Sequence, residues 1–261
     1  MTRRHVLFPC EGSLLAGTID EAPGSTGLLI VSGGNELRSG AWSGQAQFAA
    51  RIAAEGFPVF RFDRRGVGDS EGGNGGFRKS AADIAAALAA FREEEPRLTR
   101  VVAWGNCDGA SALMLAGGAG CDGLVLSNPW TIEDESEAPP AEVLRDHYKR
   151  RLADPAAIKR LLTGQIPLGK LVRSLLGAAK PATAAPMNAL TQAMADGIKG
   201  FGGDIRFLTA ARDRTAQAFL ATWDKRDPRI QTCADASHSF VEPAARDWLM
   251  GQLLEALRDK A

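Results

Sequence analysis

Short apolar runs separated by segments of helical periodicity mark the first half of the chain. Residues 5–19 alternate between apolar and polar positions around a turn at residues 11–13, which predicts a β-hairpin. The continuous apolar run at residues 27–31 is typical of a strand that is buried on both faces of a sheet. Further short apolar runs predict strands at residues 58–62, 100–104 and 123–126.

Between these strands the spacing of apolar residues becomes helical, at residues 44–55, 80–94 and 109–116. Such alternation predicts a mostly parallel sheet with helices on both faces. It stops at residues 131–200, which contain no convincing strand and are predicted to form a solvated loop and short helices rich in Arg and Lys. It then resumes with a strand at 205–209, a helix near 215–224, a weak strand at 229–233 and a final helix near 241–257. We therefore expect an α/β core made of residues 1–130 and 201–261, interrupted by a helical insertion at 131–200.

The bulk composition narrows the possible classes of protein. The chain has 261 residues, enough for one large domain with a single core. Its formal net charge is zero, so no overall basic field would recruit nucleic acid or an anionic membrane. The sequence contains no apolar run of about 18 residues, the length that would predict a transmembrane helix. Its basic start lacks the apolar segment of a signal peptide, and we therefore expect a cytoplasmic protein, monomeric or homodimeric.

The four cysteines, Cys10, Cys107, Cys121 and Cys233, lie far apart in the sequence. They show no paired spacing of the kind that holds a metal, so we expect neither a metal nor another cofactor. Cys121 and Cys233 are predicted to be small buried residues, since free cysteine is among the most buried residue types.

Cys107 stands in a different context, Gly105-Asn106-Cys107-Asp108-Gly109, between a predicted strand and a predicted helix. Glycines two residues on either side of a nucleophile, at a sharp strand-to-helix turn, form a nucleophile elbow. The usual centre is serine, and here it is cysteine. A buried structural thiol after an ordinary turn is the alternative interpretation.

Two later residues favour the catalytic interpretation. In a fold with such an elbow the order along the chain is nucleophile, acid, histidine. Asp213 lies just beyond the predicted strand 205–209, and His238 lies in the loop before the last predicted helix. His238 would accept or share the thiol proton, and Asp213 would hold the imidazole in the correct tautomer. Taken alone, Asp213 is equally well explained as a turn or helix-capping residue.

Acyl transfer also needs hydrogen-bond donors for the developing oxyanion. The backbone N–H of Asp108, directly after the nucleophile, is one expected donor. The second is expected from the loop after the strand 27–31, at Gly34 or Asn35, where glycines let the backbone approach a substrate. A plain tight turn is the alternative for this loop. The glycine-containing segment 63–70 is predicted to be a structural loop beside the elbow.

These residues resemble the α/β-hydrolase superfamily along nearly the whole chain. The landmarks are residues 31–34, 62–70, the elbow at 105–109, Asp213 and His238. More narrowly, the chain resembles the exosortase A system-associated hydrolase type 1 group, a group found at bacterial exopolysaccharide and protein-sorting loci. The residues that carry this closer resemblance are Gly33-Gly34, Arg38-Ser39-Gly40, the segment 61–70, Trp104-Gly105-Asn106-Cys107-Asp108 and Leu126-Ser127-Asn128-Pro129-Trp130.

The resemblance implies an α/β-hydrolase fold in which residues 131–200 form a helical cap over the active site. The basic residues of that segment would attract an anionic substrate or simply form the solvated faces of a lid. Dienelactone hydrolases resemble this chain in the Cys-Asp-His triad alone. We expect an acyl hydrolase (esterase, thioesterase or lactonase type) that acts on a small-molecule acyl substrate through an S-acyl intermediate. An acyltransferase with the same intermediate and a non-catalytic binding protein of this fold are the alternatives.

Overall fold

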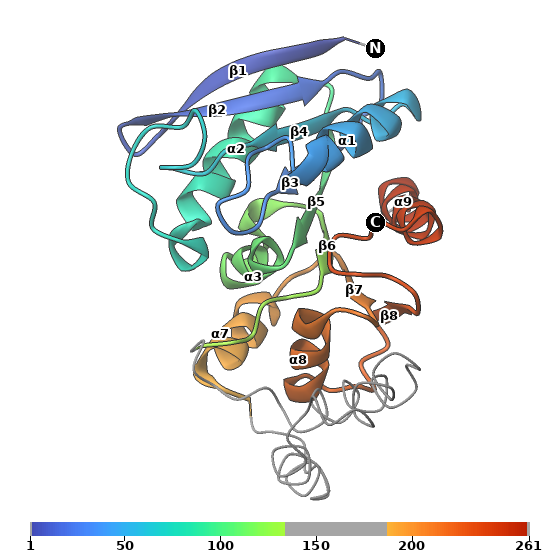
Figure 1. Ribbon diagram of the computed structural model, residues 1–261. Helices are drawn as coiled ribbons and strands as arrows, with labels where there is room; N and C mark the ends of the chain where they lie inside the picture. The colour runs from blue at the N-terminus through green and yellow to red at the C-terminus, as the bar shows by residue number, and fades with distance from the viewer. Residues whose placement is uncertain (1, 134–186, 260–261) are drawn as a thin grey trace, which may run out of the picture.

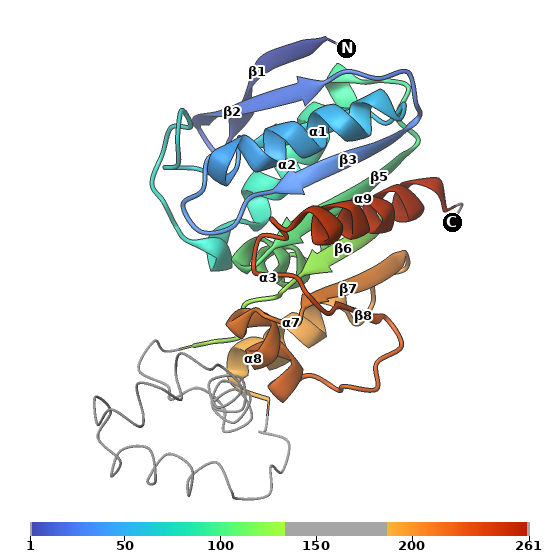
Figure 2. The ribbon, with the colours of Figure 1, turned by 45° about the vertical axis from the view of Figure 1, so that its right-hand side comes forward.

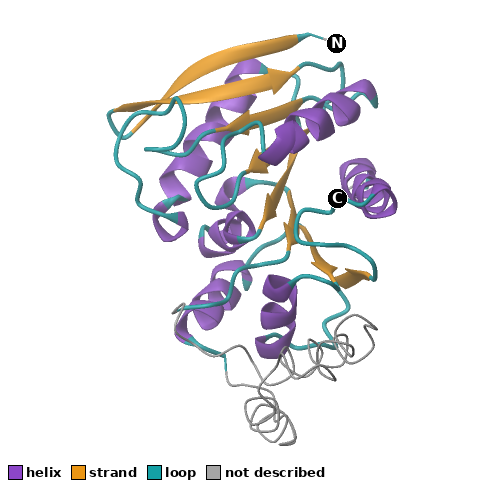
Figure 3. Ribbon diagram, in the orientation of Figure 1, coloured by secondary structure: helices purple, strands orange, loops and turns teal. Residues whose placement is uncertain are grey.

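The computed structural model describes residues 2–133 and 187–259. Within them, eight strands form one twisted sheet in the order β1-β2-β4-β3-β5-β6-β7-β8 (Figure 3). Strands β2 and β1 pair antiparallel at one edge, and all the strands from β4 to β8 run parallel. The strands are β1 Arg3–Cys10, β2 Ser13–Asp20, β3 Thr26–Val31, β4 Val59–Phe62, β5 Arg100–Asn106, β6 Gly123–Ser127, β7 Asp204–Ala210 and β8 Ile230–Cys233.

Helices cover both faces of this sheet (Figures 1 and 2). Their bounds are α1 Gly44–Ala54, α2 Ala81–Glu94, α3 Asp108–Leu115, α7 Ala189–Ile198, α8 Arg214–Thr222 and α9 Pro243–Arg258, with 3-10 turns η1 Ala41–Ser43, η2 Phe77–Lys79 and η3 Gly117–Gly120. Helices α1 and α9 lie on one face, as Figure 2 shows, and α2, α3, α7 and α8 pack on the other. The predicted α/β architecture is confirmed.

The core divides into two apolar layers because the central strands are buried on both faces. Two consecutive residues of β3, Leu28 and Leu29, are both fully buried and belong to opposite layers. The layer under α1 and α9 includes Ile52 and Leu253, and the other layer includes Phe91. This double burial explains why the parallel strands appear in the sequence as continuous apolar runs.

The segment predicted as an insertion is described only in part. Residues 134–186, with the short basic helices expected there, lie outside the described residues. The described residues 187–200 contain α7, which buries Leu190, Met194 and Ile198 and packs against α3. Whether the segment forms a cap stays a prediction. No helix of the described residues combines the length and the apolar character that crossing a membrane requires.

Candidate active site

Cys107 lies at the turn between β5 and α3, at the carboxyl edge of the sheet. Its backbone angles, φ 58° and ψ −128°, are costly for a residue with a side chain. The flanking glycines make the turn possible. A Cβ on Gly105 would lie 2.5 Å from the carbonyl carbon of Gly109, and a Cβ on Gly109 would collide with the carbonyl oxygen of Val31. The thiol is therefore presented at the N-terminus of α3, where the helix dipole favours negative charge.

The structure brings together the three residues proposed from the sequence as a triad. Asp213 directly follows β7 and its turn, and His238 lies in the loop between β8 and α9. The Nδ1 atom of His238 lies 3.0 Å from Oδ2 of Asp213, and His238 also makes a side-chain hydrogen bond with Cys107. The Asp213 side chain is 8% exposed and that of His238 is 39% exposed. A buried carboxylate thus orients an imidazole that remains accessible to a substrate.

These contacts raise the pKa of His238 from 6.5 to about 10. The largest cause is the hydrogen bond with Asp213, and the hydrogen bond with Cys107 is the second. Burial acts in the opposite direction, because it disfavours the charged form. The imidazole is therefore protonated at neutral pH and lies between a carboxylate and a sulfur.

Asp213 has a structural role as well. Its Oδ2 atom accepts a hydrogen bond of 3.0 Å from the backbone N–H of Ala216, which caps the N-terminus of α8. The two interpretations that the sequence left open for this residue are therefore compatible. The same carboxylate caps a helix and contacts His238.

The loop that follows β3 packs directly on the elbow. A Cβ on Gly33 would lie 2.8 Å from Oδ1 of Asp108 and 3.4 Å from the Cβ of Cys107. The backbone N–H of Gly34 donates a hydrogen bond to the Asp108 carboxylate. Asn35 uses its side-chain oxygen to accept a 2.7 Å hydrogen bond from Asn74, and its backbone N–H makes no hydrogen bond to the described residues.

The N–H groups of the three predicted oxyanion donors differ in whether another group already accepts their hydrogen bond. The N–H of Asp108 lies in the first turn of α3, where it has no intrahelical acceptor. The N–H of Asn35 is free in the described structure, whereas that of Gly34 is occupied by the Asp108 side chain. The oxyanion role of these groups stays a prediction, and Gly34 could serve only after the Asp108 carboxylate moves.

Arg64 contacts the loop after β3, and this role was not predicted from the sequence. Its guanidinium is buried and donates hydrogen bonds to the carbonyl oxygen of Gly34 and, at 3.1 Å, to Oγ of Ser80. One nitrogen lies 3.9 Å from Oδ2 of Asp108. Arg64 therefore connects the segment 63–70 to both the loop after β3 and the elbow.

Asn128, at the end of β6, is a second residue whose role was not predicted. It is fully buried and has a positive φ of 45°. Its Nδ2 atom donates to the carbonyl oxygen of His238 at 3.0 Å and to Oδ1 of Asn106 at 3.1 Å. Its Oδ1 atom accepts a 2.8 Å hydrogen bond from the backbone N–H of Ala210. The Asn128 side chain thus links three segments. They contain Asn106, next to Cys107; Ala210, at the end of β7 before Asp213; and His238 itself.

A cavity of about 370 Å³ lies next to these residues. It is lined by Asn106, which precedes Cys107, and by Ser239 and Phe240, which follow His238. Trp42 and Phe48, from η1 and α1, form part of the opposite wall.

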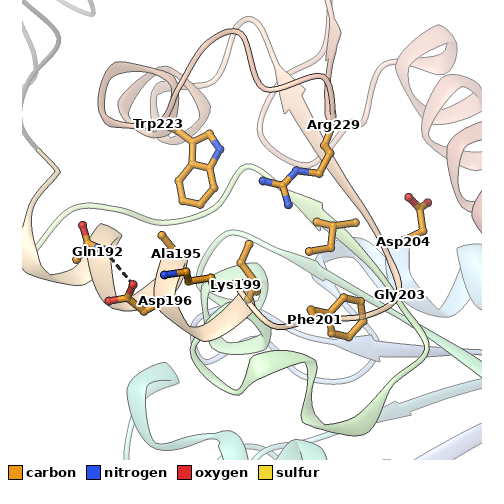
Figure 4. A pocket seen from close by; sticks show the side chains of 11 residues that line it. Gln192, Ala195, Asp196, Lys199, Phe201, Gly203, Asp204, Trp223 and Arg229 are labelled. Carbon is orange, nitrogen blue, oxygen red and sulfur yellow. Dashed lines mark hydrogen bonds between the residues drawn. The ribbon is translucent and has the colours of Figure 1, made fainter.

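Two larger cavities lie away from Cys107, Asp213 and His238. One of about 590 Å³ lies between α7, the end of α8 and the start of β7, where Lys199 faces Trp223 and Arg229 (Figure 4). The other, of about 810 Å³, is lined by residues of β1, β2 and α1. None of the three cavities is lined by a residue of the proposed triad, and only the 370 Å³ cavity is lined by chain neighbours of Cys107 and His238.

The other three cysteines are free thiols with different surroundings. Cys10 and Cys121 are buried, and burial raises the pKa of the Cys121 thiol to about 12. Cys233 is only partly buried, contrary to the expectation of a buried residue. It closes the short edge strand β8, where only one neighbouring strand covers it. In the part of the chain that the structure describes, no cluster of His, Cys, Asp or Glu has the arrangement of a metal site.

A largely parallel sheet with a strained strand-to-helix elbow, followed by an aspartate and a histidine at later strand ends, defines the α/β-hydrolase class. Residues 28–250 match the Alpha/beta hydrolase family, and the chain belongs to that family. No curated protein matches the sequence.

Solved structures of low sequence identity share the fold. The esterase Pf2001 of Pyrococcus furiosus is 17% identical, with a TM-score of 0.62, and the match covers 98% of this chain and 92% of the esterase. The α/β hydrolase GrgF of Penicillium sp. sh18 is 16% identical, with a TM-score of 0.62 and coverage of 99% and 98%. The thioesterase domain of the curacin biosynthetic pathway is 14% identical, with a TM-score of 0.57 and coverage of 97% and 100%.

Proposed function

We propose that this protein is an acyl hydrolase that cleaves thioesters, activated esters or lactones through an S-acyl intermediate on Cys107. The observation that carries the proposal is the contact of His238 with both Asp213 and Cys107. Thiolate is the nucleophilic form of cysteine, and an imidazolium beside the sulfur is a common means of activating it. An esterase and a thioesterase domain are among the proteins of similar fold, and their named activities agree with this chemistry.

The proposed reaction has two stages. The Cys107 sulfur attacks the carbonyl carbon and forms a C–S bond, while the N–H groups of Asp108 and Asn35 stabilise the oxyanion. The bond to the leaving alkoxide or thiolate then breaks, and the proton of the His238 imidazolium passes to that group. In the second stage neutral His238 removes a proton from water, the hydroxide attacks the acyl carbon, and the C–S bond breaks to release the acid.

Mass spectrometry of the intact protein after brief exposure to a p-nitrophenyl ester tests the proposal. We expect the mass to rise by one acyl group, located on Cys107, and we expect Cys107→Ala to carry no adduct and to lose turnover. Cys233→Ala removes the other partly exposed thiol and serves as the matched control, with adduct and turnover retained. An adduct on another residue, or full activity of Cys107→Ala, would refute the assignment.

Acyl transfer to an amine or thiol acceptor would proceed through the same intermediate. Product analysis with and without acceptors separates the two reactions, and the hydrolase proposal requires that water alone give full turnover.

We further propose that the chain belongs to the exosortase A system-associated hydrolase type 1 group and acts in the cytoplasm. The segments Trp104-Gly105-Asn106-Cys107-Asp108 and Leu126-Ser127-Asn128-Pro129-Trp130, which carry the resemblance to that group, support the first part.

A further inference from the structure

We propose that the 370 Å³ cavity binds an uncharged aryl or alkyl arm of the substrate, with Trp42 at its rim. This inference rests on the proposed function, because it treats Cys107 and His238 as the reacting groups. Neither residue lines the cavity, but their chain neighbours Asn106, Ser239 and Phe240 do. The cavity therefore lies beside the reactive residues, and the proposal is that the arm of a substrate whose carbonyl lies at Cys107 enters it.

Four aromatic residues, Trp42, Phe48, Trp104 and Phe240, line this cavity. Phe48, Trp104 and Phe240 are buried, and the rings of Phe48 and Trp104 pack at 5.8 Å between centroids. They form a rigid apolar floor. At the rim Trp42 is 93% exposed and Val241 is 52% exposed, so both leave large apolar surfaces in water. An apolar ligand that covered them would gain free energy of transfer at about 25 cal/mol per Å² of buried apolar area.

Most polar side chains of the lining already have hydrogen-bond partners in the protein. Glu36 accepts hydrogen bonds from the backbone N–H of Ala41 at 2.7 Å and from the side chain of Gln45 at 2.8 Å. The other end of the Gln45 amide accepts a 2.8 Å hydrogen bond from Ser32. At the rim Arg51 donates to Asp247 at 3.0 Å, and Arg246 donates to the carbonyl oxygen of Val241 at 2.9 Å. Because these groups satisfy one another, the cavity favours an apolar arm over a charged or strongly polar one.

Backbone strain is concentrated around the cavity and the neighbouring reactive residues. Trp42, Ser43 and Phe240 have positive φ angles of 55°, 57° and 50°. Such conformations cost a non-glycine residue about 1–3 kcal/mol and occur preferentially at active sites and ligand clamps. Trp42 combines this strained backbone with an exposed side chain at the rim of the cavity.

Gly44 offers a way to fill the cavity without disturbing the chain. It lines the cavity with ordinary helical angles, φ −59° and ψ −47°, and a Cβ added there meets no atom within 4 Å. A leucine at this position would therefore occupy the space of the ligand. Trp42→Ala removes the rim instead, so the two substitutions test the site in independent ways.

Binding of the neutral, unreactive probe 4-phenylbutan-1-ol to Cys107→Ala, followed by ligand-observed NMR, tests the inference without turnover. We expect both Trp42→Ala and Gly44→Leu in that background to weaken binding at least tenfold. Leu7→Ala, which removes an exposed apolar side chain from the distant strand β1, should leave it unchanged. Equal binding in all variants, or no binding to Cys107→Ala, would overturn the inference, even if the acyl adduct on Cys107 forms.

Kinetics of enzyme that retains Cys107 assign the arm to one half of the substrate. If the arm belongs to the acyl half, Gly44→Leu raises KM for phenylbutyryl esters and not for acetyl esters of the same alcohol. If it belongs to the leaving group, the increase follows the alcohol instead. An equal increase for substrates with and without an aryl group would contradict the inference. Probe binding without an acyl adduct would refute the proposed function and leave the cavity assignment standing.

Discussion

At the scale of single residues, Asn128 is the most connected side chain of the candidate site. Every hydrogen bond that its side chain makes with the described residues goes to a segment next to Cys107, Asp213 or His238. A buried amide in this position can be replaced by few other side chains, because each lost partner leaves a buried donor or acceptor unsatisfied. Such a group costs about 1–3 kcal/mol. Asn128 is therefore expected to position His238 relative to Cys107.

Asn128→Ala should lower kcat on the order of ten- to a hundredfold, as a displacement of about 1 Å can do, while KM changes little. The reaction of Cys107 with iodoacetamide should slow in parallel, because it depends on the same contact with His238. Thr209→Val is the matched control. It removes partly buried hydrogen bonds to Gln231 and Thr232 in the adjacent strand β8 but touches none of the three reactive residues. If Thr209→Val slowed alkylation as much as Asn128→Ala, a positioning role for Asn128 would be wrong.

The reactive residues could be predicted from the sequence, whereas their supports could not. Cys107, Asp213 and His238 each follow a strand at the same edge of the sheet, so chain order was enough to bring them together. Asn128 and Arg64 depend on contacts between segments that are far apart in the sequence. Asn128 bonds residues 82 and 110 positions away, and no local pattern specifies which loops meet.

At the scale of elements, the turn from β5 to α3 imposes the strictest steric requirement. Gly109→Ala would place a Cβ against the backbone of Val31, and backbone cannot move aside as a side chain can. We expect a loss of about 1–3 kcal/mol in the free energy of unfolding. Gly251→Ala should have the opposite sign, a gain of about 0.5–1 kcal/mol, because Gly251 lies inside α9 with nothing within 4 Å of the added Cβ. Urea denaturation of both variants measures the contrast, and equal effects would show that the elbow is not sterically restricted.

The parallel strands of the core could be predicted because burial on both faces makes them continuous apolar runs. The core helices could be predicted because burial of one face gives their apolar residues a helical spacing. Helix α7 was not predicted, although its signal is present in the sequence. Leu190, Met194 and Ile198 recur every four residues, and Asn188 caps the helix by accepting a 2.8 Å hydrogen bond from Thr191. The sequence around it contains no convincing strand, which favoured an interpretation of residues 131–200 as one insertion. In the structure α7 packs on α3, within the same apolar layer as α2.

At the scale of the whole molecule, the contacts of His238 link stability to pH. The pKa of this group is about 10 in the folded protein and 6.5 as its ordinary value. Protonation is therefore favoured by folding, and the contribution to stability is fully present below pH 6.5 and is lost as the pH rises through about 10. Because the His238 side chain is 39% exposed, water screens the interaction and its contribution is modest.

Asp213→Asn isolates this effect, because an asparagine can still cap α8 but no longer offers a charged partner to His238. The NMR titration midpoint of the imidazole should fall toward 6.5, and it should fall further than in Cys107→Ala, since Asp213 is the larger cause of the raised pKa. The wild-type protein should have the larger free energy of unfolding. Its advantage over Asp213→Asn should be greatest near pH 6 and should shrink steadily toward pH 10. Groups that titrate equally in both proteins cancel in this difference. A difference that grew with pH would mean that neutral, not protonated, His238 is the form that folding favours.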